Sequence, residues 1–353
     1  MIEIDGRWIG PGHPPYVIAE MSGNHNQSLD RALAIIDAIA QTGAHAVKLQ
    51  TYTADTMTLD LREREFVIDD PNSLWNGRSL YDLYEEAHTP WEWHAPLYER
   101  ARQRGLTIFS TPFDDSAIDF LEGLDTPAYK IASFENTDLP LIRSVARTGK
   151  PIIVSTGMAT LTEINQAVDT IRNEGNNQII LLKCTSTYPA DPAESHLTTI
   201  PHLRDAFGTL VGLSDHTPGI GAAIAATVLG ATVIEKHVTL NRDEGSVDSA
   251  FSLEPNELSA LAAEASRAQA SLGTIHYGPT RKEVGSMQFR RSLYVTQDLQ
   301  AGDILTRDNV RAIRPGYGLS PQHLDTILGL PVSTFVARGT PLAWNVVRRR
   351  AGT

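Results

Sequence analysis

A repeat of short apolar segments, each followed by an amphipathic segment, runs through most of this chain and constrains its fold more than any other feature. The apolar segments have the length of strands, and the amphipathic ones space their apolar residues as in helices with one buried face. Residues 29–42 illustrate the second kind, with Leu29, Leu33, Ile36 and Ile39 on one face. The eight predicted strands cover residues 16–19, 46–49, 107–109, 128–131, 152–154, 179–182, 210–213 and 233–235.

Eight strand–helix units predict an α/β protein with a closed (β/α)8 TIM barrel. An open parallel sheet uses the same pattern, but eight nearly continuous apolar strands favour closure. Glycines precede several strands, where a left-handed residue commonly ends a helix; they are Gly43, Gly105, Gly149 and Gly230. At the start of the chain, Asp5-Gly6 between alternating apolar residues predicts an N-terminal β-hairpin.

The repeat stops near residues 271–288, where glycines and a proline accumulate. We expect a barrel domain over residues 1–278, a linker over 279–289 and a small turn-rich β module over 290–353. That last segment has nine Arg and four Asp with no Lys or Glu, whereas the whole chain has a net charge of −12. A basic tail can bind nucleic acid, but arginines scattered through an apolar pattern better suit a small domain that docks on an acidic body.

The composition excludes several classes of protein. A net charge of −12 argues against nucleic acid or an anionic membrane as partner. The single cysteine, Cys184, permits no intramolecular disulfide. The first residues are polar and acidic, unlike a signal peptide, and no apolar run is long enough to span a bilayer. We therefore expect a cytoplasmic protein.

Polar residues follow every predicted strand, at the end of the barrel where TIM-barrel enzymes carry out their chemistry. One polar strand end is weak evidence, but eight of eight indicate a site. The first polar residues at these ends are Glu20, Gln50, Ser110, Ser133, Ser155, Thr185, Ser214 and Glu235. The long segment between Tyr52 and Thr89 is expected to form part of the rim of that site.

Two lysines inside strands, Lys48 and Lys130, suggest an anion site, because a buried ammonium group is costly without a negative partner. The alternative is that each lysine pairs with a barrel carboxylate such as Glu20 or Glu235, and both explanations can hold together. We favour a site for a phosphate and a carboxylate, completed by hydroxyl groups. Those hydroxyls are expected from Thr111, Ser133, Ser155 and Ser214.

Two histidines, His216 and His237, follow neighbouring strands seven and eight. A lone histidine at a strand end is more often structural than a ligand, but a pair at the substrate face favours a metal. Asp215 and Glu235 are expected to support the imidazoles. Two histidines completed by oxygen ligands suit Mn²⁺, with Mg²⁺ or Co²⁺ as substitutes, whereas structural zinc would need more His or Cys.

Taken together, these motifs resemble the sialic acid synthase family, and residues 290–353 resemble that family's antifreeze-like (SAF) domain. The resemblance covers essentially the whole chain in order. It is carried by Ile18-Ala19-Glu20, Asn24-His25-Asn26, Lys48-Leu49-Gln50-Thr51, Ser110-Thr111-Pro112, Tyr129-Lys130-Ile131, Ser155-Thr156-Gly157-Met158, Ser214-Asp215-His216-Thr217 and Glu235-Lys236-His237.

Within the family, the segment from Ala19 to His25 is most similar to the branch that makes pseudaminic acid. The resemblance implies a transferase that condenses phosphoenolpyruvate with 2,4-diacetamido-2,4,6-trideoxy-L-altrose and releases phosphate. N-acetylneuraminate or legionaminic acid synthesis is the alternative, with the same chemistry on another sugar. An alternative of a different class is a non-catalytic carbohydrate- or ice-binding protein built around the C-terminal module.

The resemblance also implies roles for residues. Glu20 and Glu135 would act as catalytic carboxylates, and His216 and His237 would hold the metal that polarises the sugar aldehyde. Ser186 joins the predicted phosphoenolpyruvate site, where the sialic acid enzymes commonly have asparagine; its hydroxyl can still donate to phosphate. Residues implied for the sugar are Gln50, Tyr188, Asp248 and Arg314. Arg314 would reach the active site of the partner subunit in a domain-swapped homodimer.

Overall fold

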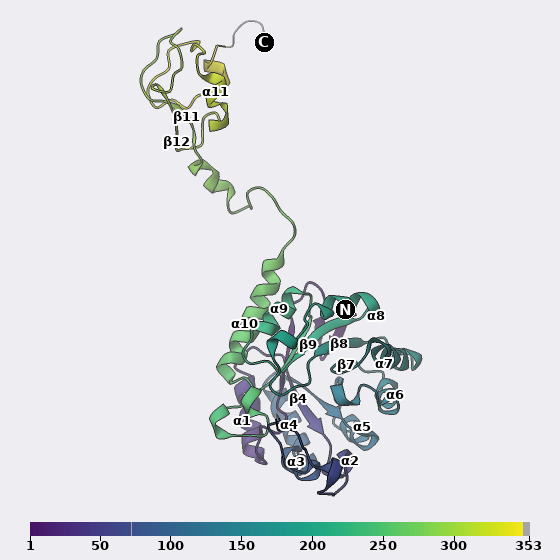
Figure 1. Cartoon of the computed structure of the whole chain (residues 1–353). Coiled ribbons are helices and arrows are strands. Elements are labelled where there is room, and N and C mark those ends of the chain that lie inside the picture. The colour runs from purple at the N-terminus through teal and green to yellow at the C-terminus, as the bar shows by residue number, and fades with distance from the viewer. Residues whose placement is uncertain (72, 349–353) are drawn as a thin grey trace. The chain divides into compact units, whose positions relative to one another are not determined.

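The computed structural model describes residues 1–71 and 73–348, and the chain divides into two compact units, Met1–Gly273 and Thr274–Thr353. The first unit is a closed barrel of eight parallel strands surrounded by helices (Figure 1), which confirms the predicted (β/α)8 fold. Its strands are hydrogen-bonded in chain order, with the last closing on the first. They are β3 (Tyr16–Glu20), β4 (Ala46–Thr51), β5 (Thr107–Pro112), β6 (Tyr129–Ile131), β7 (Ile152–Ser155), β8 (Ile179–Cys184), β9 (Leu210–Asp215) and β10 (Val233–His237).

The helices of this unit follow the strands in the expected alternation, with three helices in the long connection after β4. Polar side chains cap several first turns: Ser28 accepts from the N–H of Arg31, and Thr160 and Glu163 form a reciprocal capping box. No helix within the described residues is long and apolar enough to cross a membrane. The helices are α1 (Leu29–Ile39), α2 (Ala54–Met57), α3 (Leu80–Ala87), α4 (Trp91–Gln103), α5 (Asp115–Glu122), α6 (Leu139–Arg147), α7 (Leu161–Asn173), α8 (Thr199–Phe207), α9 (Gly221–Val228) and α10 (Pro255–Leu272).

The glycines expected before strands do adopt the left-handed backbone. Gly43, Gly105, Gly149 and Gly230 have φ values of +83°, +73°, +71° and +98°. A residue with a Cβ would be strained there, so glycine lets each helix end and the chain turn into the next strand.

Alternation along the strands divides the apolar residues into two clusters. On β3, Val17 and Ala19 pack outward against the helices, whereas Tyr16 and Ile18 fill the barrel interior. The N-terminal hairpin of β1 (Ile2–Ile4) and β2 (Arg7–Ile9) contributes its buried isoleucines to the interior cluster. That cluster lies toward the starts of the strands. The barrel interior therefore becomes polar only toward the C-terminal strand ends.

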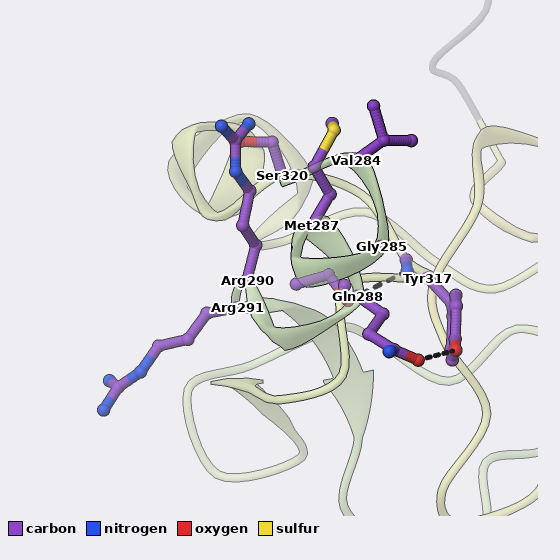
Figure 2. A pocket seen from close by; sticks show the side chains of 11 residues that line it. Val284, Gly285, Met287, Gln288, Arg290, Arg291, Tyr317 and Ser320 are labelled. Atoms are coloured by element: carbon purple, nitrogen blue, oxygen red, sulfur yellow. Dashed lines mark hydrogen bonds between the residues drawn. The ribbon is translucent and has the colours of Figure 1, made fainter. Parts of the chain in front are cut away.

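The second unit has its own small apolar core and a two-stranded antiparallel sheet of β11 (Ser292–Val295) and β12 (Val310–Ile313). A short helix, α11 (Leu324–Ile327), follows, and residues 349–353 of the expected module lie outside the described residues. Within the expected linker, Val284–Phe289 forms a 3-10 helix. A hollow of about 590 Å³ lies beside this helix, lined in part by Arg290 and Tyr317 (Figure 2).

Candidate active site

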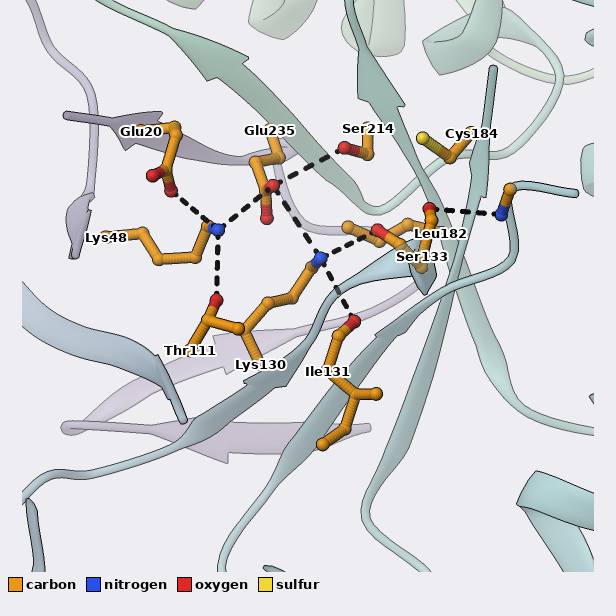
Figure 3. Close-up of polar contacts among 12 residues, drawn as sticks. Glu20, Lys48, Thr111, Lys130, Ile131, Ser133, Leu182, Cys184, Ser214 and Glu235 are labelled. Carbon is orange, nitrogen blue, oxygen red and sulfur yellow. Dashed lines mark hydrogen bonds and ion pairs between the residues drawn. The ribbon is translucent and has the colours of Figure 1, made fainter. Parts of the chain in front are cut away.

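The two lysines predicted to bind an anion both approach one buried glutamate (Figure 3). Lys48 on β4 pairs with Glu20 on β3 at 2.6 Å and lies 3.4 Å from Glu235 on β10. Lys130 on β6 donates to the hydroxyl of Ser155 at 2.7 Å and lies 3.7 Å from the same Glu235. The carboxylate pairing that the sequence left open is therefore present, with Glu235 between the two ammonium groups.

The two lysines differ in how well their charge is compensated. Both are almost completely buried. For Lys48, burial alone would lower the pKa, but Glu20 and Glu235 outweigh that effect and raise it. For Lys130, burial dominates and lowers the pKa, because its carboxylate partner is more distant and shared. A phosphate or carboxylate beside Lys130 would favour its charged form, so the predicted anion site is compatible with the ion pairs.

Hydroxyl groups and the backbone of Gly157 lie close together next to the lysines of the predicted anion site. The N–H of Gly157, in the loop after β7, donates to the Ser133 hydroxyl at 3.2 Å. A Cβ at Gly157 would collide with the hydroxyls of Ser133 and Ser186, so only glycine permits this approach. Thr111 accepts from Lys48 at 3.2 Å.

The remaining predicted hydroxyl, Ser214 on β9, donates to Glu235 at 3.4 Å. Of the seven residues predicted to bind phosphoenolpyruvate, five thus lie on β4, β5, β6, β7 and β9, and Ser133 and Ser186 lie in the segments after β6 and β8, at the same end of the barrel.

His216 and His237 face each other where β9 and β10 end, with ring centroids 5.2 Å apart. Nδ1 of His216 lies 3.0 Å from the Thr185 carbonyl, which accepts a hydrogen bond from the ring N–H and leaves Nε2 directed away from this contact. Nδ1 of His237 is buried without a hydrogen-bond partner and lies 3.6 Å from Asp248. Burial lowers the pKa of His237 well below its usual value, so this imidazole is neutral at pH 7. For His216, burial would also lower the pKa, but contacts with Cys184 and the Thr185 carbonyl outweigh that effect and raise it. His237 is therefore the neutral imidazole of the pair, the form that suits metal ligation.

The surroundings of the pair fit an ion that keeps positions for water and substrate. In the part of the chain that the structure describes, no group of three or more His, Cys, Asp and Glu side chains could hold a metal. Asp215, expected to support His216, instead pairs with Lys236 at 2.7 Å on the outer side of the strands. Glu235 serves the lysines, so Asp248 is the carboxylate beside His237. Two imidazoles completed by oxygen ligands suit Mn²⁺, Mg²⁺ or Co²⁺ better than structural zinc.

Residues predicted to bind the sugar meet next to Glu20. The Ser22 hydroxyl donates to Asp248 at 2.5 Å and accepts from the amide of Gln50 at 3.2 Å. That amide also donates to Glu20 at 3.1 Å. Burial raises the pKa of Asp248 to about 6, although the Ser22 hydrogen bond opposes the shift. Two of the four predicted sugar ligands, Gln50 and Asp248, therefore form one network with a predicted catalytic carboxylate, Glu20.

Glu135 stands apart from the ion pairs. It ends the short 3-10 helix Ser133–Glu135 after β6, and its Oε2 atom is buried without a hydrogen-bond partner. Burial raises the pKa of Glu135 to about 7, and the nearby Lys130 only partly opposes this. A carboxyl that titrates near neutral pH can exchange protons with a substrate or water. Glu135 is therefore better suited to proton transfer than Glu20, which Lys48 holds at 2.6 Å.

An aromatic wall borders the histidines. The Tyr188 ring lies 4.5 Å from the His216 ring and 5.3 Å from Phe251 between ring centroids. Trp75, from the long connection after β4, lies 5.8 Å from Tyr188. Its indole N–H donates to the carbonyl of Val247 at 3.1 Å. The connection thus reaches the site, as expected of a rim segment.

Arg314 belongs to the C-terminal unit, where it is exposed directly after β12. The backbone beside it is held in place: the N–H of Gly316 donates to Gln288 and the Ser292 hydroxyl donates to the Pro315 carbonyl, both at 2.8 Å. The arginine is therefore presented from a fixed loop.

Family models match both units of the chain. One described as the NeuB family matches residues 35–277, and one described as the SAF domain matches residues 290–348. The chain belongs to the NeuB family. This membership confirms the resemblance to the sialic acid synthases and agrees with the observed barrel.

Within the NeuB family, the chain is 44% identical to the pseudaminic acid synthase of Helicobacter pylori, over 95% of this chain and 98% of that protein. It is 41% identical to the pseudaminic acid synthase of Campylobacter jejuni, over 93% of this chain and 95% of that protein. Identity is lower, at 34%, to the N,N'-diacetyllegionaminic acid synthase of Legionella pneumophila, over 93% of each chain.

A solved structure has the same fold. It is the N-acetylneuraminic acid synthetase of Leptospira borgpetersenii, which aligns with a TM-score of 0.72 at 30% identity. The alignment covers 82% of this chain and 95% of that one.

Two residues that help to form the site were not among the predicted site residues. Glu235, by contrast, was expected beside the lysines or the imidazoles, and alternation along β10 places it on the same face as His237, two residues later. Ser22 and Trp75 carry no such signal, because a polar loop residue and a rim tryptophan gain their positions only from tertiary contacts.

Proposed function

We propose that the chain condenses phosphoenolpyruvate with 2,4-diacetamido-2,4,6-trideoxy-L-altrose and water to give pseudaminic acid and phosphate. The observation that carries this proposal is that two buried lysines sharing Glu235 and a pair of facing histidines lie at the same end of the barrel. The support for this particular sugar is the higher identity to relatives named pseudaminic acid synthase than to a legionaminic acid synthase.

Phosphoenolpyruvate carries a phosphate and a carboxylate, which matches two lysines surrounded by hydroxyl groups. Lys130 is the less compensated cation, so we place one anionic group beside it, within reach of Ser155. The Gly157 loop, with Ser133 and Ser186, offers further donors. These contacts would fix phosphoenolpyruvate with its C3 atom toward the sugar aldehyde.

His216 and His237 would hold a divalent metal, Mn²⁺ in first place. When bound, such an ion supplies Lewis-acid polarisation of the open-chain sugar aldehyde. The chain's own contribution is to keep the His237 imidazole neutral and to fix His216 through the Thr185 carbonyl. Removal of the ion with a chelator is expected to abolish turnover, and unchanged activity in His237→Ala would contradict this role.

The reaction then needs carboxylates around a developing cation. Attack of C3 of phosphoenolpyruvate on the aldehyde carbon forms the new C–C bond and leaves positive charge at C2. Glu20 faces this region from β3, and Glu135 has the raised pKa of a group able to take a proton from water. Water adds at C2, and the tetrahedral intermediate loses phosphate by cleavage of the C2–O bond.

The sugar site combines polar and apolar parts. Asp248 and Gln50 offer hydrogen bonds to hydroxyl or amide groups, and Tyr188 with Trp75 offers an aromatic surface. A diacetamido, 6-deoxy sugar carries three methyl groups that can lie against aromatic rings. We propose that Arg314 of a partner subunit completes the site in a homodimer, holding an N-acetyl group.

The test is to supply the purified enzyme, phosphoenolpyruvate and Mn²⁺ with each candidate sugar and to follow phosphate release. Preferred turnover of the trideoxy-L-altrose derivative is expected. Preferred turnover of N-acetylmannosamine, or of the sugar that leads to legionaminic acid, would replace the proposed product with that of another branch.

A non-catalytic carbohydrate- or ice-binding role is the alternative of another class. It offers no reason for two buried lysines and two facing histidines in the barrel. Absence of phosphate release with every amino sugar tried, together with sugar binding by the isolated chain, would favour it.

A further inference from the structure

Ser22 has an unfavourable backbone conformation at the edge of the site. It comes two residues after Glu20, the last residue of β3, and has a φ of +47°. Side chains with a Cβ rarely adopt this region, which favours glycine. Ser22 is also buried, at 6% exposure, so it is not a solvent-facing turn residue. Strained residues of this kind persist where surrounding contacts hold them, and they cluster at functional sites.

The contacts of Ser22 all lead to predicted substrate-binding or catalytic residues. Its hydroxyl donates to Oδ2 of Asp248 at 2.5 Å and accepts from Nε2 of Gln50 at 3.2 Å. Its N–H donates to Oε1 of Glu20 at 3.0 Å. Asp248 Oδ2 lies 3.6 Å from Nδ1 of His237 as well. One hydroxyl therefore fixes the orientation of a carboxylate and of an amide from two different elements.

The structural connection between these loops is made by a different residue. The Asn24 amide donates to the Val238 carbonyl at 2.8 Å and to the Ser252 hydroxyl at 2.9 Å, and its oxygen accepts from Ser246. These bonds tie the loop after β3 to the segment after β10. The loops would remain joined without the Ser22 hydroxyl, whose contacts are those with Gln50 and Asp248.

We infer that Ser22 is a positioning residue for the amino sugar, holding Asp248 and Gln50 in the orientations that bind it. This inference rests on the proposed function. The unfavourable φ is retained because a glycine, which fits the backbone better, would leave both side chains without their common partner. Ser22 thus acts on sugar affinity and not on phosphoenolpyruvate, whose predicted ligands lie around Lys130.

Two variants separate the hydroxyl from the backbone strain. Ser22→Gly removes both, whereas Ser22→Ala removes the hydroxyl and keeps the strained Cβ. Because a hydrogen bond to a charged group is lost in each, the KM for the amino sugar is expected to rise about tenfold in both variants. The KM for phosphoenolpyruvate is expected to stay as in the wild type. Ser22→Gly should melt at a higher temperature than Ser22→Ala, because it relieves the strain.

Asp125→Gly is the matched control for strain relief alone. Asp125 has a φ of +56° and is exposed in the turn before β6, whereas the site residues Ser133 and Glu135 follow the other end of that strand. Its replacement should leave both KM values unchanged. An unchanged sugar KM in both Ser22 variants would overturn the inference. So would a parallel rise of both KM values with a lower melting temperature, since that result indicates a structural role.

The KM comparison is made with whichever amino sugar the wild type uses. If the wild type uses a sugar other than the trideoxy-L-altrose derivative, the proposed substrate is wrong, while the Ser22 variants still decide the positioning role on that sugar.

Discussion

Lys48 and Lys130 have the same residue type and similar burial, yet we expect their removal to have different consequences. Lys48→Met would leave the carboxylate of Glu20, which is fully buried, without its partner at 2.6 Å. Breaking a buried pair in this way costs about 3–5 kcal/mol of the free energy of unfolding. Lys130→Met leaves Glu235 with Lys48 as partner and should cost less.

Urea unfolding of both apo variants measures this difference, and thermal shifts with phosphoenolpyruvate measure ligand binding. Lys130→Met should fold with near wild-type stability and lose most of the ligand-induced shift. Equal destabilisation by the two substitutions would contradict the assignment of Glu20 to Lys48.

Glu135 predicts how activity depends on pH. Its pKa is raised to about 7, so its ionised form, which can accept a proton, accumulates as the pH rises through 7. We expect kcat/KM to rise with pH up to about pH 7 and then to level off. The residual activity of Glu135→Gln should lack this rise. If Glu135→Gln shows the same rise in kcat/KM near pH 7, another titrating group is responsible for it.

The same shift has a consequence for stability, with a definite sign. The folded protein binds the Glu135 proton more tightly than an unfolded chain, whose glutamate has a pKa of 4.5. Its contribution to the free energy of unfolding therefore falls as the pH rises from about 4.5 to about 7 and is constant above that. Glu135→Gln should be relatively more stable than the wild type above pH 7, as measured by denaturant unfolding at several pH values.

Individual site residues could be predicted where a strand fixed their direction. Lys48, Lys130 and His237 lie on strands whose period of two sends alternate side chains inward, so their convergence followed from the barrel itself. Asp215 was assigned to the histidine pair although it lies one residue from His216 and so faces outward, toward Lys236. Ser22 could not be predicted, since its role depends on a left-handed backbone and on contacts with two distant segments.

At the scale of elements, every barrel strand except β6 begins where the apolar pattern begins, and β6 begins one residue later. Seven of the eight strands end one to three residues beyond that pattern. Their ends are polar, but the backbone ladder continues because hydrogen bonding between strands does not depend on side-chain polarity. A rule based on hydrophobicity therefore ends strands early at an active site.

The long connection after β4 gives a prediction of its own. Its segment from Val67 to Ser79 closes on itself by a β-bridge, and Trp75 at its tip binds the Val247 carbonyl and faces Tyr188. Trp75→Ala should raise the KM for the amino sugar about tenfold through loss of aromatic contact, with the KM for phosphoenolpyruvate unchanged.

Leu74→Ala is the control for this element. Leu74 precedes Trp75 and is 49% exposed, so its truncation should leave both constants unchanged. Equal effects of the two substitutions would mean that the loop as a whole, and not the indole ring, supports sugar binding.

At the scale of the whole molecule, the change of pattern near residue 271 indicated two parts, and the chain divides after Gly273. Local sequence signals locate such a change because apolar periodicity stops there. They say nothing about which surface a small basic module docks on, since that depends on complementarity between folded surfaces. The exposed Arg314 loop and the exposed rings of Phe289 and Tyr317 are the surface of this module that we expect to meet a second copy.

Subunit mixing tests whether two copies share an active site. Arg314→Ala removes the arginine that we propose each subunit provides to its partner, and His216→Ala removes a predicted metal ligand from its own barrel, so each homodimer should be inactive. After random exchange, about half of the dimers carry one of each subunit. In such a dimer, the subunit with Arg314→Ala still has His216 in its barrel. The other subunit, with His216→Ala, supplies Arg314 to that barrel. One complete site per mixed dimer restores about a quarter of wild-type activity, whereas an arginine acting within its own chain restores none.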